Sequence, residues 1–240
     1  MTTNRLPGNG AAGDARGGDA SAGEVSPPVL TAQQHAVASL RRLMVSGALR
    51  PGQRVNQEEV AARAGLSVAT VREALRVLEQ EGQLTYRPRR GYFVTELQYE
   101  DLREIYELRA VLEERAARHA LPLVDDGALE RITAAAGACA EAAQAGEVAA
   151  ELAANRAFHF AILEAPGQPH TLRLIRLLWD STEVYRAMYY NLPEERTASV
   201  HAHDRIIEAI RAGDADRLVR EMDDHRERAL KVLHDVLSRP

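Results

Sequence analysis

The sequence has one cysteine and no long uncharged apolar run among its 240 residues. A single thiol, Cys139, cannot form an internal disulfide, so we expect a reducing compartment and a small apolar role for this side chain. No window approaches the roughly 18 apolar residues of a membrane-spanning helix. The Gly- and Ala-rich start also lacks the apolar stretch of a secretory signal. These absences predict a cytoplasmic protein without a membrane segment.

Positive charge is concentrated in one part of the chain. The whole sequence has a net charge of -5, but residues 31–95 carry ten arginines and five acids, a balance of +5. Residues 96–240 carry 18 basic and 27 acidic side chains, a balance of -9. A compact basic segment in an acidic chain indicates that this segment alone approaches a polyanion such as DNA.

Residues 31–95 show the order of elements that is typical of a winged helix-turn-helix domain. Apolar residues recur at three- and four-residue spacing in three stretches, and Gly82 is expected to end the third helix. Two short β-prone runs, residues 84–86 and 92–94, flank a basic turn and predict a hairpin. The three predicted helices span about 31–47, 56–64 and 67–81.

The rest of the sequence predicts helices alone. Amphipathic stretches joined by short turns favour an antiparallel bundle. The fold class is therefore mainly α: a disordered N-terminal tail over residues 1–30, a winged helix-turn-helix domain of three helices and a β-hairpin wing over residues 31–95, and an all-helical ligand-binding and dimerisation domain over residues 96–240. The helices predicted in this last domain span roughly 99–119, 126–144, 147–164, 169–189, 194–211 and 214–237.

The start of the third helix and the basic turn hold the candidate DNA contacts. A helix-turn-helix unit places the N-terminal residues of its second helix in the major groove, and here that helix begins at Ser67. The turn over residues 87–91 predicts a wing for the minor groove or flanking phosphates. Each residue taken alone has an ordinary alternative, a helix cap or a solubilising loop charge, but the combination favours DNA binding. The candidates are Ser67, Thr70, Arg72, Arg89, Arg90 and Gly91.

The segment PGQRVNQEEVAARAGLSVATVREALRVLEQEGQLTYRPRRGYFV resembles the winged-helix domain of the GntR superfamily. The helical remainder resembles the FadR-like C-terminal effector domain, the FCD domain. The resemblance implies a homodimeric transcriptional regulator that binds a double-stranded DNA operator and responds to a small molecule. The family usually has arginine at the position of Val68. This departure implies a different base preference, with Val68 meeting a thymine methyl if it lies at the groove.

Eight histidines are candidate metal ligands, and their spacing alone leaves the choice among them open. Asn155 and His159 are four residues apart, so on a helix they share a face. His203 and His225 lie on two later predicted helices, and facing helices of a bundle are a usual place for a metal site. His201 would point nearly opposite to His203. A surface or hydrogen-bonded role is the favoured alternative for His35, His119, His170 and His234.

The resemblance selects four of these residues. FCD domains that bind metal use an acid four residues before a histidine, then one histidine on each of two later helices, which places the ligands at Asn155, His159, His203 and His225. Asn155 replaces the acid, and its amide oxygen brings no charge, so we expect weaker metal binding than with Asp. Imidazole with an oxygen ligand suits zinc, nickel, iron or manganese, and we expect a divalent ion, zinc or nickel.

Arg109 is the candidate ligand-binding residue. It matches a position where the family often has an arginine that points into the cavity, where it would bind a carboxylate with two parallel hydrogen bonds. The alternative is a surface ion pair with Glu113, which lies four residues further along the same predicted helix.

Together these features predict a ligand-responsive regulator, a repressor, and not an enzyme. A small effector, expected to be a carboxylate, would bind in the helical domain through the metal and shift the placement of the DNA-reading domains. Di-iron bundles need Glu-x-x-His motifs, and no acid stands three residues before any histidine here. The alternative is a DNA-binding regulator whose helical domain only dimerises and whose metal site is vestigial.

Overall fold

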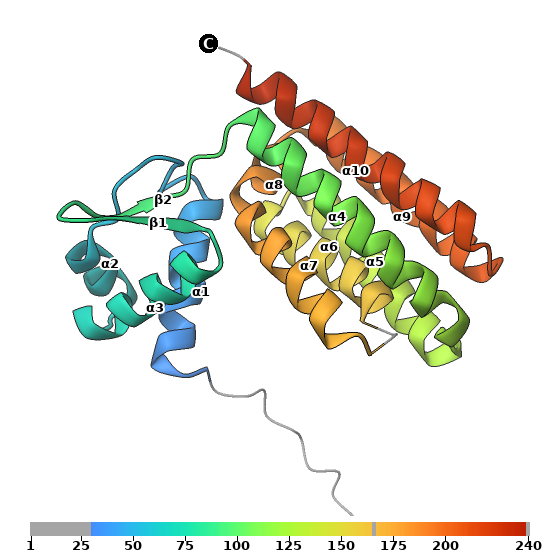
Figure 1. Cartoon of the computed structure of the whole chain (residues 1–240), viewed down its shortest axis with the longest axis horizontal. Helices are drawn as coiled ribbons and strands as arrows, with labels where there is room; N and C mark the ends of the chain where they lie inside the picture. Colours follow the sequence, from blue (N-terminus) through green and yellow to red (C-terminus); the bar gives the residue numbers. More distant parts are fainter. Residues whose placement is uncertain (1–29, 165–166, 239–240) are drawn as a thin grey trace, which may run out of the picture.

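The structure is a computed structural model that describes residues 30–164 and 167–238. It contains an N-terminal winged-helix domain beside a larger helical bundle (Figure 1). The predicted tail over residues 1–30 lies outside the described residues, except for Leu30. Among the described residues, none of the helices combines the length and the apolar character that a bilayer crossing requires.

Three helices and a two-stranded hairpin form the N-terminal domain, in the predicted order. Thr31 caps the first helix through a capping box with Gln34, Asn56 caps the second, and Ser67 caps the third. These side chains accept hydrogen bonds from the otherwise unpaired backbone N–H groups of the first turn. The elements are α1 (Ala32–Val45), α2 (Gln57–Ala64), α3 (Val68–Gln80), β1 (Leu84–Arg87) and β2 (Gly91–Val94).

The hairpin turn holds two residues with left-handed backbone conformation. The strands are antiparallel, with Arg87 opposite Gly91 at the turn. Gly91 has a φ of 91°, and Arg89 has a φ of 62°, which is uncommon for a residue with a side chain. The turn that joins the two strands lies at the end of the hairpin away from the helical domain (Figure 1).

The helical domain contains seven α-helices and one short 3₁₀ turn among the described residues. Helix α4 packs against α10 on one side and α7 on the other, and α5 packs along α6 (Figure 1). A buried apolar core, which includes Ile132, Phe158, Trp179 and Ile206, lies between these helices. Their bounds are α4 (Tyr99–Ala120), η1 (Leu121–Leu123), α5 (Asp126–Ala145), α6 (Val148–Leu163), α7 (Pro169–Ser181), α8 (Glu183–Tyr190), α9 (Pro193–Arg211) and α10 (Ala215–Leu237).

One predicted helix is divided in the structure. The sequence predicts a continuous helix over residues 169–189, whereas α7 ends at Ser181 and α8 begins at Glu183. The Thr182 hydroxyl donates to the carbonyl oxygen of Trp179 at 3.3 Å, and the Arg186 guanidinium donates to the same oxygen at 2.7 Å. The backbone N–H of Thr182 also donates to this oxygen, at 3.3 Å, so at the break the carbonyl is bonded by two side chains and by a backbone group only three residues away. The prediction of one helix was wrong for this reason.

Direct contacts join the two domains. Helix α1 packs on α8, and Val184 and Tyr185 belong to the same apolar cluster as the core of the N-terminal domain. The backbone N–H of Leu97 donates to the Tyr185 hydroxyl at 2.7 Å. Arg41 pairs with Glu183 of the helical domain at 3.8 Å. These contacts place the winged-helix domain against α8, whose residues also reach the interior of the bundle.

Candidate functional site

Three histidines from three different helices meet in the interior of the helical domain. His159 lies on α6, His203 on α9 and His225 on α10, and all three are buried. One ligand atom of each lies within 4.8 Å of the ligand atoms of the other two. The rings of His159 and His225 are stacked, with centroids 5.3 Å apart. The structure therefore brings together the three histidines that the resemblance selected.

Asn155 joins this cluster from one turn earlier on α6. Its side chain is buried, and its Oδ1 lies 3.1 Å from Nε2 of His203, so this pair forms a hydrogen bond. Within the described part of the chain, the Nδ1 atoms of all three histidines are buried without a hydrogen-bond partner. Because buried polar atoms are usually paired, these unpaired nitrogens indicate a site for a further partner.

The environment keeps the three imidazoles neutral. Burial lowers the pKa of His159 and of His203 well below the usual 6.5, and the neighbouring imidazoles add to the effect. Burial, followed by the charges of Arg226 and Arg109, lowers the pKa of His225 to about 4. Neutral imidazole is the form that binds metal ions, so the donor chemistry and protonation of this site fit a divalent cation.

Beside the histidines lies a buried ion network centred on Glu113. This carboxylate accepts from Arg109 at 2.9 Å, from Arg226 at 2.9 Å and from the Trp179 indole at 2.7 Å. Burial by itself would raise the pKa of Glu113, but the charges of Arg109 and Arg226 outweigh it and hold the pKa below its ordinary value. The pair of Arg109 with Glu113 exists, but the alternative of a surface position is wrong, since both side chains are buried.

Arg186 is a site residue that sequence reasoning missed. Its side chain is buried, and its guanidinium stacks on the Trp179 ring, 4.4 Å from the centroid, on α8 beside the break in the predicted helix. It donates to neutral oxygens of Trp179 and Thr182, and burial lowers its pKa to about 10. No spacing or motif signals this residue, because the helix break that turns it inward is itself a tertiary feature.

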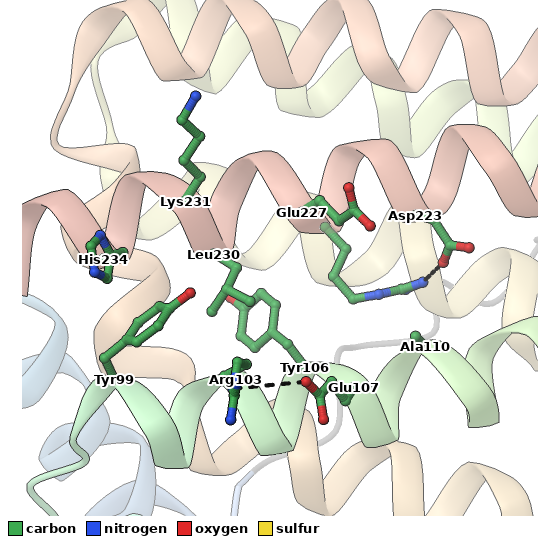
Figure 2. Close-up of a pocket in the computed structure, with 11 residues that line it drawn as sticks. Tyr99, Arg103, Tyr106, Glu107, Ala110, Asp223, Glu227, Leu230, Lys231 and His234 are labelled. Atoms are coloured by element: carbon green, nitrogen blue, oxygen red, sulfur yellow. Dashed lines mark hydrogen bonds and ion pairs between the residues drawn. The ribbon is translucent and has the colours of Figure 1, made fainter.

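Two of the clustered histidines and three arginines line a small cavity that borders a larger groove. The cavity has a volume of about 30 Å³, and Arg109, Asn155, His159, Arg186 and His225 are among the residues that line it. A groove of about 510 Å³ runs between α4 and α10 (Figure 2). Tyr106 and Arg226 line both spaces, so they form the wall between the groove and the histidine cavity.

The other histidines lie elsewhere. His35, His119, His170, His201 and His234 are exposed. Cys139 is buried, and burial raises the pKa of its thiol to about 12. None of these side chains belongs to the histidine cluster.

Of the candidate DNA contacts at the N-terminal end of α3, Ser67 and Arg72 are exposed and Thr70 is half-buried. The Ser67 hydroxyl accepts from the backbone N–H of Thr70 at 3.1 Å and lies 2.8 Å from the Thr70 hydroxyl. Arg72 is exposed, with a long contact of 3.4 Å to Gln57. Val68 is half-buried and packs against the apolar core. Ser67 is therefore a helix cap, with its hydroxyl at a surface that also offers Thr70 and Arg72.

The wing places its arginines in solvent. Arg89 and Arg90 are exposed, next to the half-buried Gly91. Arg87 stacks on Phe93, 4.5 Å from the ring centroid. The tip of the hairpin therefore presents Arg89 and Arg90 without competing carboxylate partners among the described residues.

The order of elements defines a winged helix-turn-helix domain followed by an all-helical domain, and comparison with known proteins gives the family. Residues 32–94 match the family described as bacterial regulatory proteins, gntR family, and residues 104–228 match the FCD domain. The chain belongs to the GntR family of DNA-binding transcriptional regulators with an FCD effector-binding domain, and it is not an enzyme.

Two relatives agree with this assignment, and a solved structure shares the fold. The chain is 29% identical over 211 residues to the Nta operon transcriptional regulator of Aminobacter aminovorans, covering 77% of this chain and 99% of that protein. It is 27% identical over 173 residues to the HTH-type transcriptional regulator YdhC of Bacillus subtilis, covering 72% and 77%. The solved structure of E. coli McbR/YncC has the same fold, with a TM-score of 0.76, 22% identity and coverage of 86% and 99%.

Proposed function

We propose that this protein is a dimeric repressor that binds a double-stranded DNA operator in the cytoplasm and responds to a small carboxylate bound beside a divalent metal. The observation that carries the proposal is a cluster of three buried, neutral histidines, two of which, His159 and His225, line one cavity together with Arg109 and Arg186. DNA contact is assigned to Ser67, Thr70, Arg72, Arg89, Arg90 and Gly91.

The ligand set supports a metal such as zinc or nickel. His159, His203 and His225 would supply imidazole nitrogens, and Asn155 would supply an amide oxygen in exchange for its hydrogen bond to His203. This donor set is neutral, so a bound divalent ion would keep its full positive charge. When bound, the ion supplies a positive centre that attracts an anionic ligand.

The charges around the cavity favour an anion as effector. Arg109, Arg186 and Arg226 are buried beside Glu113, which is the fully buried carboxylate of this network. Arg226 also pairs with Asp223, which is 40% exposed. Arg186 has neutral partners, and a carboxylate would give it a charged one. Because the cavity holds about one water-sized group, a larger effector would extend past Tyr106 and Arg226 into the groove between α4 and α10.

An exposed apolar face supports dimerisation. Leu108 and Val111 on α4 and Leu174 and Leu177 on α7 are exposed, on two helices that pack together. Near this face α4 carries Glu104, Glu107 and Arg115, and α7 carries Arg173. A two-fold contact would bury the apolar centre of the face in both copies.

This face has a direct test. Val111→Asp places a charge at its centre and should convert the dimer to a monomer, as measured by light scattering after size exclusion. Leu123→Asp changes an exposed apolar residue of η1 outside the face and should leave the dimer intact. A dimer that persists in Val111→Asp would show that the copies meet elsewhere.

A second reading is a regulator whose helical domain only dimerises. The specific observation in its favour is that Asn155, which replaces the usual acid, is already bonded to His203. In this case the histidine cluster would be a vestigial metal site with no response to ligand.

Thermal melting separates the two readings. We expect zinc or nickel to raise the melting temperature relative to chelator, and one of a panel of small carboxylic acids to raise it further in the presence of metal. A ligand at one hundred times its dissociation constant adds about 2.7 kcal/mol of stability. His203→Ala should lose the metal response, whereas the exposed His201→Ala, two residues away on α9, should keep it. Equal metal shifts in both variants would contradict the site.

A further inference from the structure

A second, larger cleft lies at the junction of the two domains. Its volume is about 810 Å³, and it is bounded by the end of α1 and the loop that follows on one side, and by α6 and α8 on the other. Leu49, Leu152, Val184 and Met188 are among the apolar residues that line it. This volume is within the range of sites for small organic molecules, and the histidine cavity is not part of its lining.

The cleft is basic in a chain that is acidic overall. Among the described residues, Glu183 is the one acid in its lining, and the arginines there are Arg41, Arg42, Arg50 and Arg156. The lining therefore has a balance of +3, although the whole sequence has a net charge of -5. A concave basic surface with apolar walls concentrates field lines and attracts anions.

Two of these arginines have carboxylate partners and two do not. Arg41 pairs with Glu81 at 2.6 Å, and Arg156 pairs with Asp180 at 2.8 Å. Arg42 donates to the Ser39 hydroxyl at 2.8 Å, which is a neutral group. Among the described residues, neither Arg42 nor Arg50 forms an ion pair. The cleft therefore keeps two positive charges that an acidic ligand group would neutralise.

We propose that this cleft binds an amphipathic organic anion, with an aromatic or branched apolar body and one acidic group. The apolar walls would bury the body, and Arg42 or Arg50 would bind the acid. A nucleic acid phosphate backbone does not fit the apolar walls. Because the walls come from both domains, an occupant contacts both and stabilises this placement of the DNA-binding domain. The site is separate from the proposed histidine site and does not depend on it.

The test uses a fluorescent probe of this chemical class. The probe is 1-anilinonaphthalene-8-sulfonate, which has an apolar aromatic body and one sulfonate, added to the full chain in the presence of chelator. We expect saturable binding of one probe per chain. The uncharged analogue N-phenyl-1-naphthylamine should bind at least about tenfold more weakly, since it lacks the charged partner for the arginines. The histidine cavity of about 30 Å³ is too small for either probe.

Matched variants locate the site. Ala153→Glu puts a negative charge into the cleft from an exposed position on α6 and should weaken probe binding at least about tenfold. Ala138→Glu makes the same change at an exposed position on α5 that does not line the cleft and should have no effect. The double substitution of Arg42→Gln and Arg50→Gln should weaken binding of the sulfonate probe but not of the uncharged analogue.

Three outcomes would overturn the proposal. The first is that the sulfonate probe shows no saturable binding. The second is that Ala153→Glu and Ala138→Glu bind the probe with equal affinity. The third is that the parent protein binds the charged and uncharged probes with equal affinity. If metal does not raise the melting temperature of the parent protein but the probe still binds, the proposed metal site is contradicted and the proposal for this cleft stands.

Discussion

The winged-helix domain and the helical domain hold their functional side chains in opposite environments. Arg72, Arg89 and Arg90 are exposed, with their charge in water until a polyanion arrives. Arg109 and Arg186 are buried, with their charge balanced by Glu113 or held by neutral oxygens and an aromatic ring. The exposed arginines of the winged-helix domain therefore depend on few neighbours, whereas the buried arginines are part of the core of the helical domain. Substitutions should therefore affect binding alone in the first, and stability as well in the second.

The largest expected effect comes from Glu113→Gln. This change leaves Arg109 and Arg226 buried without their shared carboxylate, and breaking a buried pair in this way costs about 3–5 kcal/mol. The free energy of unfolding in urea measures the loss. Glu114→Gln, at a position where the side chain is 45% exposed and pairs with Arg118, is the matched control and should cost less than about 1 kcal/mol. Equal losses would show that the Glu113 network is not part of the folded core.

Acid should destabilise the helical domain through its histidines. The folded-state pKa of His225 is lowered to about 4, whereas the unfolded state protonates near 6.5. Its contribution to stability is therefore complete above pH 6.5 and is lost as the pH falls toward 4. The loss is about 3 kcal/mol, in order of magnitude.

Urea unfolding of the chelated protein at pH 7 and at pH 4.5 measures this effect. Carboxylates also titrate in this range, so the informative quantity is the difference between variants. His225→Gln should lose less stability than the parent between these pH values, and the exposed His201→Gln should lose as much as the parent. An identical pH dependence in all three proteins would rule out a buried neutral His225.

The smallest effect on stability, with a specific effect on binding, is expected for Arg72→Ala. The binding site is DNA selected from a random pool by the parent protein. The variant should bind this DNA about 1–3 kcal/mol more weakly than the parent does, and its melting temperature should be unchanged. Arg76→Ala, one turn further along α3 at an exposed position paired with Glu73, is the control and should bind nearly as well. A lowered melting temperature at full DNA affinity would instead assign Arg72 a structural role.

The helices were predictable to within a residue or two, because their ends carry local signals. Thr31, Asn56, Ser67 and Asp214 cap their helices through contacts with residues two or three positions away. The break at Thr182 was not predictable, since it depends on a side chain, Arg186, that reaches back to a carbonyl oxygen. Local capping is readable from spacing, and a helix break that depends on buried packing is not.

The ligand site shows the same division. Its three histidines were predicted from a family resemblance, because the spacing of residues on separate helices does not show which helix faces meet. Arg186 and Arg226 were missed for the same reason, and the pair of Arg109 with Glu113 was foreseen, but only as a surface alternative, because four-residue spacing says nothing of burial.

The two-domain order, the helical periodicity, the helix caps and the basic character of the N-terminal domain can be derived from the sequence, because each depends on composition or on residues within one or two turns. Which imidazoles meet, which arginines are buried and where clefts open depend on the tertiary structure. These features follow from the packing of helices that are far apart in the sequence, such as the contact of Arg226 with Glu113 across 113 positions.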